Sequence, residues 1–416
     1  MDFSLTPEQE LIRATAREFC DRELQPSAQA WDEAEELPRS LVAQLADAGF
    51  LAASLPEELG GGGLDSISYC LLCEELGRAD SSVRGIVSVS NGLFGKTVAK
   101  WGSDEQRAAW LPRLGAGEAL GCYALTEPGC GSDAAALATR AVREGDDWLL
   151  TGSKVFITLG SWADVAIVFA RTGGDGPRGI TAFLVPTDAP GFFAHPIKGK
   201  LGLRAQDTAE LSLDGVRVPD AARLGEEGQG FKVAMSALDN GRISLAAGCV
   251  GIAQGCLDAA VAYAREREAF GRPVGGFQLV QQLLAEMHVE TEAARLLTWK
   301  AAALADVGEE YTTEAAVAYA REREAFGRPV GGFQLVQQLL AEMYVETEAA
   351  RLLTWKAAAL AGAGDGYTTE AAVAKWYASE TAVRAANAAV QVLGGYGYVD
   401  EYPVAKYLRD ARVTTL

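Results

Sequence analysis

This 416-residue sequence has few histidines, and it has fewer basic residues than acidic ones. Only two histidines occur, His195 and His288, so a Ser-His-Asp triad, a histidine-rich metal site or a histidine-based pH switch has almost no ligands or bases to use. We therefore expect no metal site. Lysine and arginine total 37 against 56 aspartates and glutamates, a formal net charge of −19, which argues against nucleic acid or an anionic membrane as a partner.

Cysteine is also sparse, and no long apolar run is present. The seven cysteines are an odd number, which is typical of a reducing compartment and not of a disulfide framework. Cys70 and Cys73 form a lone C-x-x-C, which we interpret as two small apolar residues in a helix, with a zinc or redox role as the alternative. The start, MDFSLTPEQE, has no signal-peptide pattern, and we expect a cytoplasmic protein without membrane insertion.

The hydrophobic pattern changes twice along the chain and predicts three domains. Residues 1–118 have helical periodicity and begin at Thr6 with the spacing of a capping box. Residues 119–228 contain β-rich runs separated by Gly, Asp and Pro clusters, and we expect a compact antiparallel barrel. Residues 229–416 are helical again. The predicted fold is α+β and mostly α, and it is not a Rossmann fold because strands and helices do not alternate.

A block of 56 residues occurs twice in the last domain. Residues 259–314 (copy 1) and 315–370 (copy 2) are identical at 51 of 56 positions. Solenoid repeats diverge further and need more copies, so we interpret the block as a recent or artificial tandem duplication of one helical hairpin. We expect copy 1 to dock in the bundle and copy 2 to pack outside it. The five differing pairs are His288/Tyr344, Asp306/Gly362, Val307/Ala363, Glu309/Asp365 and Glu310/Gly366.

Three segments combine glycine, hydroxyl and arginine side chains in a way that suits a cofactor. Residues 123–133 read YALTEPGCGSD, and residues 391–401 read QVLGGYGYVDE. Small residues at a turn let backbone N–H groups approach a flat ring or a phosphate. In the third segment, Arg267 near a predicted helix end suits a pyrophosphate. An ordinary glycine turn, a helix C-cap and a surface arginine remain the respective alternatives.

Taken together, the three segments resemble the acyl-CoA dehydrogenase family, and the resemblance covers essentially the whole chain. Residues 121–133 and 391–410 match its two signatures, and Gly241 and Leu296-Leu-Thr-Trp resemble the short-chain, butyryl-type branch. The resemblance implies FAD-dependent α,β-dehydrogenation of a short- or medium-chain acyl-CoA in fatty acid β-oxidation, with electrons passed to an electron-transfer flavoprotein. It also implies a homotetramer, which the duplication would perturb.

The resemblance also implies which residues bind the cofactor. Tyr123, Leu125 and Thr126 match contacts to the flavin ring, and Phe156 and Thr158 match the strand that packs behind it. The remaining positions match contacts to the pyrophosphate, to the adenine end or to a neighbouring subunit's FAD. These remaining positions are Ser132, Arg267, Phe270 and Gln278, the duplicates Arg323, Phe326 and Gln334, and Gln391 and Gly395.

Substrate contacts and the catalytic base complete the comparison. Ser132, Asp239 and Arg242 match positions that contact the CoA arm. The family's usual base is the Glu of a Tyr-Glu-Gly-Thr segment, which by spacing would be the second residue beyond Leu416. The alternative location for the base holds Gly241, and Asp239 is a weak substitute. We therefore assign no catalytic residue, and keep as alternatives a non-catalytic flavin and acyl-CoA binding protein, a defective truncated product, or a related oxidase reaction.

Overall fold

The protein is described by a computed structural model that covers residues 5–307, 383, 386, 398–399 and 403–415. Its contacts divide the chain into two compact units, each built from segments far apart in sequence. We call residues 1–25, 66–79 and 245–416 the helical unit, and residues 26–65 and 80–244 the strand unit. The division into three consecutive domains remains a prediction from the sequence.

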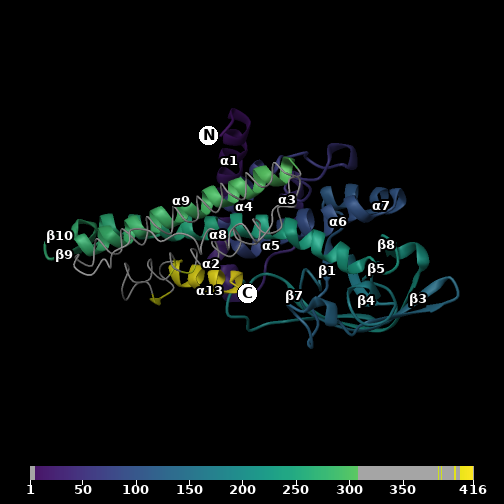
Figure 1. Ribbon diagram of the computed structural model, residues 1–416. Helices are drawn as coiled ribbons and strands as arrows, with labels where there is room; N and C mark the ends of the chain where they lie inside the picture. The colour runs from purple at the N-terminus through teal and green to yellow at the C-terminus, as the bar shows by residue number, and fades with distance from the viewer. Residues whose placement is uncertain (1–4, 308–382, 384–385, 387–397, 400–402, 416) are drawn as a thin grey trace, which may run out of the picture. The chain divides into compact units, whose positions relative to one another are not determined.

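The helical unit begins with the predicted capping box. The Thr6 hydroxyl accepts a hydrogen bond from the Gln9 backbone N–H, and the Gln9 side chain accepts one from the Thr6 N–H. Figure 1 shows α4 and α9 beside the part of α8 (Gly230–Glu266) that belongs to this unit. Its described elements are α1 (Pro7–Phe19), η1 (Cys20–Leu24), α4 (Ser66–Ala79), β9 (Glu268–Ala269), β10 (Arg272–Pro273), η7 (Val274–Gly276), α9 (Gln278–Val307) and α13 (Val404–Thr414).

Glycines in α8 let the helices of this unit approach closely. A Cβ at Gly251 would lie 2.0 Å from the Glu74 carbonyl oxygen, and one at Gly77 would lie 2.4 Å from the Gly248 carbonyl oxygen. No side chain fits at either position, so α4 and α8 pack backbone against backbone. Cys70 and Cys73 are both buried in α4, as our interpretation of the C-x-x-C predicts.

The strand unit combines short helices with a single large sheet. Its helices are α2 (Gln25–Ala34), α3 (Leu41–Asp47), η2 (Glu57–Leu59), α5 (Ser81–Ser88), η3 (Val89–Gly95), α6 (Lys96–Trp101), α7 (Asp104–Gly115), η4 (Ala134–Ala136), η5 (Pro177–Gly179) and η6 (Asp220–Ala222). Its strands are β1 (Gly121–Ala124), β2 (Arg140–Glu144), β3 (Asp147–Thr158), β4 (Val165–Arg171), β5 (Ile180–Pro186), β6 (Phe192–Pro196), β7 (Thr208–Pro219) and β8 (Arg223–Leu224).

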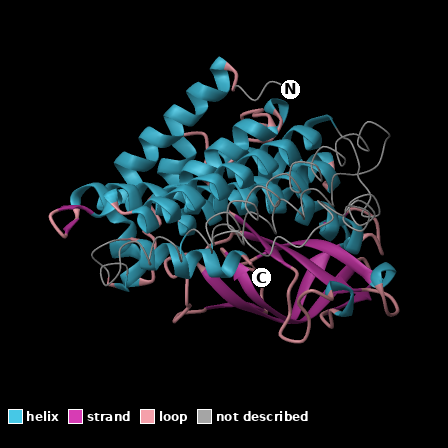
Figure 2. Cartoon of the chain, turned by 60° about the vertical axis from the view of Figure 1, so that its left-hand side comes forward, coloured by secondary structure: helices cyan, strands magenta, loops and turns pink. Residues whose placement is uncertain are grey.

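The sheet corrects the prediction of an antiparallel barrel. Its strand order is β6-β7-β3-β2-β4-β5-β8 with β1 beside β4, and β4 pairs in parallel with both β1 and β2. The sheet is therefore mixed, and β6 and β8 lie at the two ends of its order; Figure 2 shows the strands in magenta. The three β-rich runs of the sequence are present as β3, β4 and β5, but the parallel pairing depends on long connections that strand periodicity does not encode.

Helix α8 (Gly230–Glu266) supplies residues to both units and is unusually apolar. By length and composition it could cross a membrane, with a mean hydropathy of 1.6 over its best window, and 67% of that window is buried inside the structure. A buried core helix has the same composition. The absence of membrane insertion therefore remains a prediction.

Candidate functional site

The loop that follows β1 presents an open, side-chain-poor surface. Glu127 and Cys130 exchange backbone hydrogen bonds of 3.0 and 3.1 Å, which close a tight turn. A Cβ at Gly129 or Gly131 would meet no atom within 4 Å, and Ser132 is exposed. The loop therefore leaves room for a ligand to approach its backbone, as the sequence predicts.

Phe156 stands beside this loop in a strained conformation. The Val155 N–H donates to the Thr126 carbonyl at 2.9 Å, so the end of β3 is attached to the loop. The β3–β7 register breaks between Lys154 and Ile157, and Phe156 has a φ of 60° with an exposed fraction of 67%. A bulky residue in the left-handed region with its ring in solvent costs about 1–3 kcal/mol and is typical of a ligand site.

Thr158 has a partner that the sequence does not reveal. The Gln206 side-chain N–H donates to the Thr158 hydroxyl at 3.2 Å, which leaves the hydroxyl proton free to donate to a ligand. Gln206 is itself buried, and a Cβ at Gly85 would lie 1.9 Å from its side-chain oxygen. A lone glutamine between β6 and β7 carries no pattern that would have identified it.

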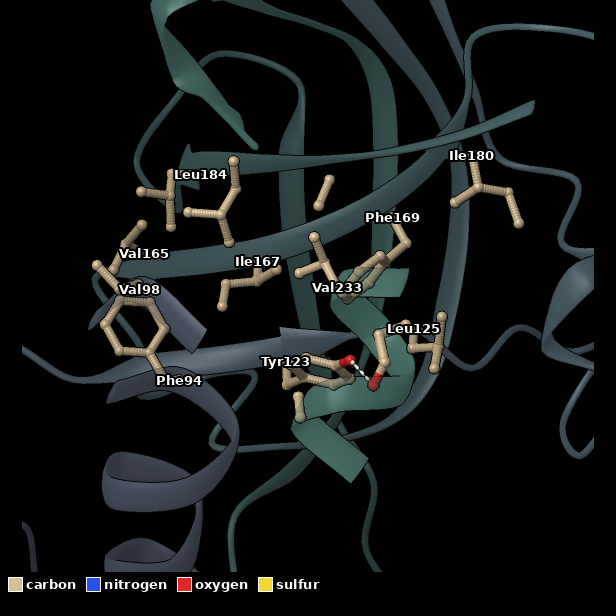
Figure 3. Close-up of a cluster of buried hydrophobic side chains, with 14 of the residues drawn as sticks. Phe94, Val98, Tyr123, Leu125, Val165, Ile167, Phe169, Ile180, Leu184 and Val233 are labelled. Atoms are coloured by element: carbon tan, nitrogen blue, oxygen red, sulfur yellow. Dashed lines mark hydrogen bonds between the residues drawn. The ribbon is translucent and has the colours of Figure 1, made fainter. Parts of the chain in front are cut away.

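Tyr123 and Leu125 lie in the hydrophobic cluster behind the loop (Figure 3). The Tyr123 hydroxyl donates to the Ala234 carbonyl at 3.0 Å, and its ring centroid lies 4.9 Å from that of Phe169. Burial raises the pKa of Tyr123, so the phenol stays neutral. The side chains of Tyr123 and Leu125 pack into the cluster and support the loop. Their backbone groups and the half-buried Thr126 are therefore left to contact a cofactor.

A buried ion pair lies inside the same loop, and the sequence analysis missed it. Lys154 is fully buried and its ammonium group lies 2.7 Å from the Glu127 carboxylate. The β-rich run Leu149–Thr158 predicts that Lys154 lies on a strand. The alternation of polar and apolar residues along a strand does not reveal which polar side chain points into the core.

Two of the three predicted substrate contacts, Asp239 and Arg242, lie on α8, and the third, Ser132, lies in the loop after β1. Arg242 donates to the Asp239 carboxylate at 2.7 Å, and both side chains are partly exposed. A Cβ at Gly241 would lie 3.2 Å from a Leu93 methyl group. Asp239 is therefore already engaged by a guanidinium.

The remaining predicted cofactor contacts of copy 1 lie at the α8–α9 turn of the helical unit. Phe270 has a φ of 52° and an exposed fraction of 97%, in the two-residue hairpin of β9 and β10. Arg267 and Gln278 are exposed beside it. These three belong to the helical unit, whereas the loop around Thr126 belongs to the strand unit. The predicted residues Arg323, Phe326, Gln334, Gln391 and Gly395 lie outside the described residues.

The strand-unit residues fit a flat heteroaromatic cofactor. An exposed aromatic ring, two hydroxyl groups and glycines without neighbouring atoms surround one backbone loop, which suits ring stacking and edge hydrogen bonds. Within the described residues, no group of three or more His, Cys, Asp or Glu side chains could hold a metal ion. The site therefore defines a protein that binds an organic ring cofactor at the loop after β1 and the end of β3.

Comparisons with known proteins identify the class. The acyl-CoA dehydrogenase N-terminal domain matches residues 6–118, the middle domain matches 122–216, and the C-terminal domain matches 228–318 and 310–416. The short-chain specific acyl-CoA dehydrogenase of Rattus norvegicus mitochondria is 39% identical over 408 residues, which are 98% of this chain and 85% of the rat protein. The chain belongs to the acyl-CoA dehydrogenase family, whose members are oxidoreductases.

Two solved structures agree with this assignment. A chain of the structure described as the electron transferring flavoprotein of Acidaminococcus fermentans matches with a TM-score of 0.83 and 36% identity, covering 100% of this chain and 95% of that one. The glutaryl-CoA dehydrogenase of Mycobacterium smegmatis in complex with FADH2 matches with a TM-score of 0.79 and 34% identity, covering 99% and 90%. The fold is therefore that of the acyl-CoA dehydrogenases.

Proposed function

We propose that this protein is an FAD-dependent dehydrogenase of short- or medium-chain acyl-CoA thioesters that passes its electrons to an electron-transfer flavoprotein. The observation that carries the proposal is the strained, exposed Phe156 beside Thr126 and Thr158. When bound, FAD supplies the acceptor for a hydride from the β-carbon of the acyl group. The family, and the neighbours that contain FADH2 and an electron transferring flavoprotein, support this choice of cofactor and partner.

In this proposal the strand unit holds the flavin ring and orients the thioester. Phe156 covers one face of the ring, while the Thr126 and Thr158 hydroxyl groups hydrogen-bond to its edge. Arg242, held by Asp239 at 2.7 Å, presents its remaining N–H groups to the CoA arm, and the exposed Ser132 contacts both cofactor and substrate. The buried cluster behind Tyr123 excludes water from the rear of the loop.

The exposed α8–α9 turn supports a homotetramer. Arg267, Phe270 and Gln278 are solvent-exposed in this chain, so their cofactor contacts are available to the FAD of a second copy. Duplicated contacts at Arg323, Phe326 and Gln334 would compete with them. We place the protein in the cytoplasm, in agreement with its odd and sparse set of cysteines.

The catalytic base is the point at which this proposal is most easily tested. The polypeptide of these 416 residues carries Asp239 already bound to Arg242, and we expect negligible oxidation of butyryl-CoA by it. The same polypeptide with Tyr-Glu-Gly-Thr appended should be faster by about 10²–10⁴-fold, because a positioned general base is restored. The rate at which butyryl-CoA bleaches the flavin absorbance under anaerobic conditions measures the oxidation rate of each polypeptide.

Two other outcomes would change the conclusion. Equal, rapid bleaching by both polypeptides would show that the base lies elsewhere, and Asp239→Asn would then identify or exclude Asp239. Tight binding of FAD and butyryl-CoA without bleaching in either polypeptide would instead support a non-catalytic binding protein.

A further inference from the structure

The three donors of the Lys154 ammonium group are all matched. The group lies 2.7 Å from the Glu127 carboxylate, 2.7 Å from the Phe169 carbonyl and 3.2 Å from the Leu125 carbonyl. All three partners are acceptors, and an ammonium group has three donors and no acceptor. Lys154 therefore connects β3 to β4 and to both residues that flank Thr126.

Glu127 extends the connection to a second stretch of chain. Its carboxylate accepts hydrogen bonds from the Ala138 N–H at 2.6 Å and the Thr139 N–H at 3.0 Å. Burial alone would raise the pKa of Glu127, but the Lys154 ammonium and these hydrogen bonds outweigh it and lower the pKa. The carboxylate is therefore ionised, and it closes the loop of residues 127–138 at its base.

Stability alone does not explain why this pair is ionic. A buried ion pair loses its hydration, and replacing both partners by groups of similar size is often neutral or stabilising. Besides each other, the two side chains bind four backbone groups: the Leu125 and Phe169 carbonyls and the Ala138 and Thr139 N–H groups. All of these except the Phe169 carbonyl lie next to the loop or at its end. Apolar side chains could fill the same volume, but they could not orient those backbone groups.

We propose that the Lys154–Glu127 pair is a positioning device that fixes the backbone at Leu125–Glu127, so that Thr126 and Phe156 face the flavin in a preformed arrangement. The proposal rests on the proposed function only for the identity of the ligand. Lys154 holds the loop from one side and Val155, the next residue, holds the Thr126 carbonyl at 2.9 Å. Loss of the pair would leave Thr126 attached at a single point beside a strained residue.

The test separates positioning from stability by comparing single and double variants. Lys154→Met leaves Glu127 buried without its cation, and we expect lower stability together with about 10²-fold weaker FAD binding. Lys154→Met combined with Glu127→Gln removes both charges and retains an acceptor for the Ala138 and Thr139 N–H groups. We expect this double variant to recover most of the stability of the apoprotein, measured by urea unfolding, but to keep weak FAD binding and an altered visible spectrum of bound flavin.

The matched control is Glu74→Gln, which neutralises an equally buried carboxylate of the helical unit. It should leave both FAD affinity and the flavin spectrum unchanged. A double Lys154/Glu127 variant that binds FAD with wild-type affinity and spectrum would overturn the inference. If Lys154→Met fails to fold, Glu127→Gln alone gives the same comparison with the control.

Hydrogen exchange provides a readout that does not need the cofactor. Peptides that cover residues 125–139 and Val155 should exchange faster in the double variant than in the wild type, and the control should not change them. Unchanged exchange there would contradict the inference. A wild-type protein that binds no FAD, with faster exchange in the double variant, would instead overturn the proposed function and leave the positioning role intact.

Discussion

The two units each contain a buried Arg/Lys–Glu pair, and the partners around the two pairs differ. In the strand unit, the spare donors of Lys154 go to backbone carbonyls at 2.7 and 3.2 Å. In the helical unit, Arg295 of α9 pairs with Glu74 of α4 at 2.8 Å and donates to the Gln254 side chain of α8 at 2.8 Å. The first pair therefore orders a loop, whereas the second ties three helices together through their side chains.

The pKa values of the two carboxylates, Glu127 and Glu74, are shifted in opposite directions. Glu127 receives two backbone N–H groups besides its cation, and its pKa is lowered. Burial raises the pKa of Glu74 despite the opposing effect of Arg295. A group at a ligand loop is thus held more firmly in its charged form than a group that only joins helices.

The largest expected effect comes from breaking the helical pair. Glu74→Leu leaves Arg295 buried without its main counter-ion, and we expect the free energy of unfolding to fall by about 3 kcal/mol. FAD affinity should not change, because Glu74 and Arg295 belong to the helical unit and the predicted flavin loop belongs to the strand unit. Urea unfolding and FAD titration measure the two quantities.

The pH dependence of this pair gives a second test. Because the folded-state pKa of Glu74 is raised, its contribution to stability is fully present below the unfolded pKa and is lost as the pH rises through the folded value. The stability of the wild type relative to Glu74→Gln, which cannot titrate at this position, should therefore fall as the pH rises above the unfolded-state pKa of Glu74. A relative stability that increases with rising pH would contradict this account of the helical unit.

Deleting one copy of the duplicated hairpin should have an intermediate effect. Removing residues 315–370 or residues 259–314 gives two chains of equal length that differ at only five positions, among them Asp306/Gly362. Asp306 of copy 1 accepts hydrogen bonds from the Ser66 N–H at 2.9 Å and the Ser66 hydroxyl at 2.6 Å at the start of α4. The chain that keeps copy 1 should be more stable by about 1 kcal/mol, the value of a helix N-terminal cap.

Thermal unfolding of the two deletions gives the result directly. Substituting Gly362→Asp in the chain that keeps copy 2 should restore most of the difference. We also expect removal of residues 315–370 to raise solubility and melting temperature above those of the full chain. A lower melting temperature after that deletion would show that copy 2 is a stabilising part of the bundle.

The smallest expected stability change is at the strained aromatic residue. Phe156→Gly relieves a φ of 60°, so the apoprotein should keep its stability to within about 1 kcal/mol, while FAD binding weakens. Phe193→Gly is the control, because Phe193 is also an exposed phenylalanine of the same sheet, on β6. It should lose stability and retain FAD affinity. Equal FAD affinity in both variants would remove Phe156 from the site.

The sequence predicts elements and local motifs of this fold better than long-range pairing. The Thr6 capping box and the strands β3, β4 and β5 depend on neighbouring residues, and the structure contains them. The parallel pairing of β4 with β1 depends on chain connections, and the prediction of an antiparallel arrangement was wrong for that reason.

In the candidate site, too, local motifs are predictable from the sequence and long-range contacts are not. Its glycines, hydroxyls and Phe156 lie in recognisable segments, because a ligand surface needs particular residue types at short spacing. Lys154 and Gln206 were missed because their roles arise from side chains that turn inward and meet distant segments. Such contacts leave no periodic signal in a single sequence.

The central claim is that the strand unit carries a flavin site, and the absorbance spectrum of the purified protein tests it most directly. The account predicts a yellow protein, or an apoprotein that takes up one FAD per chain on titration with a shifted flavin band. A colourless protein that shows no spectral change or fluorescence quenching with added FAD would contradict it.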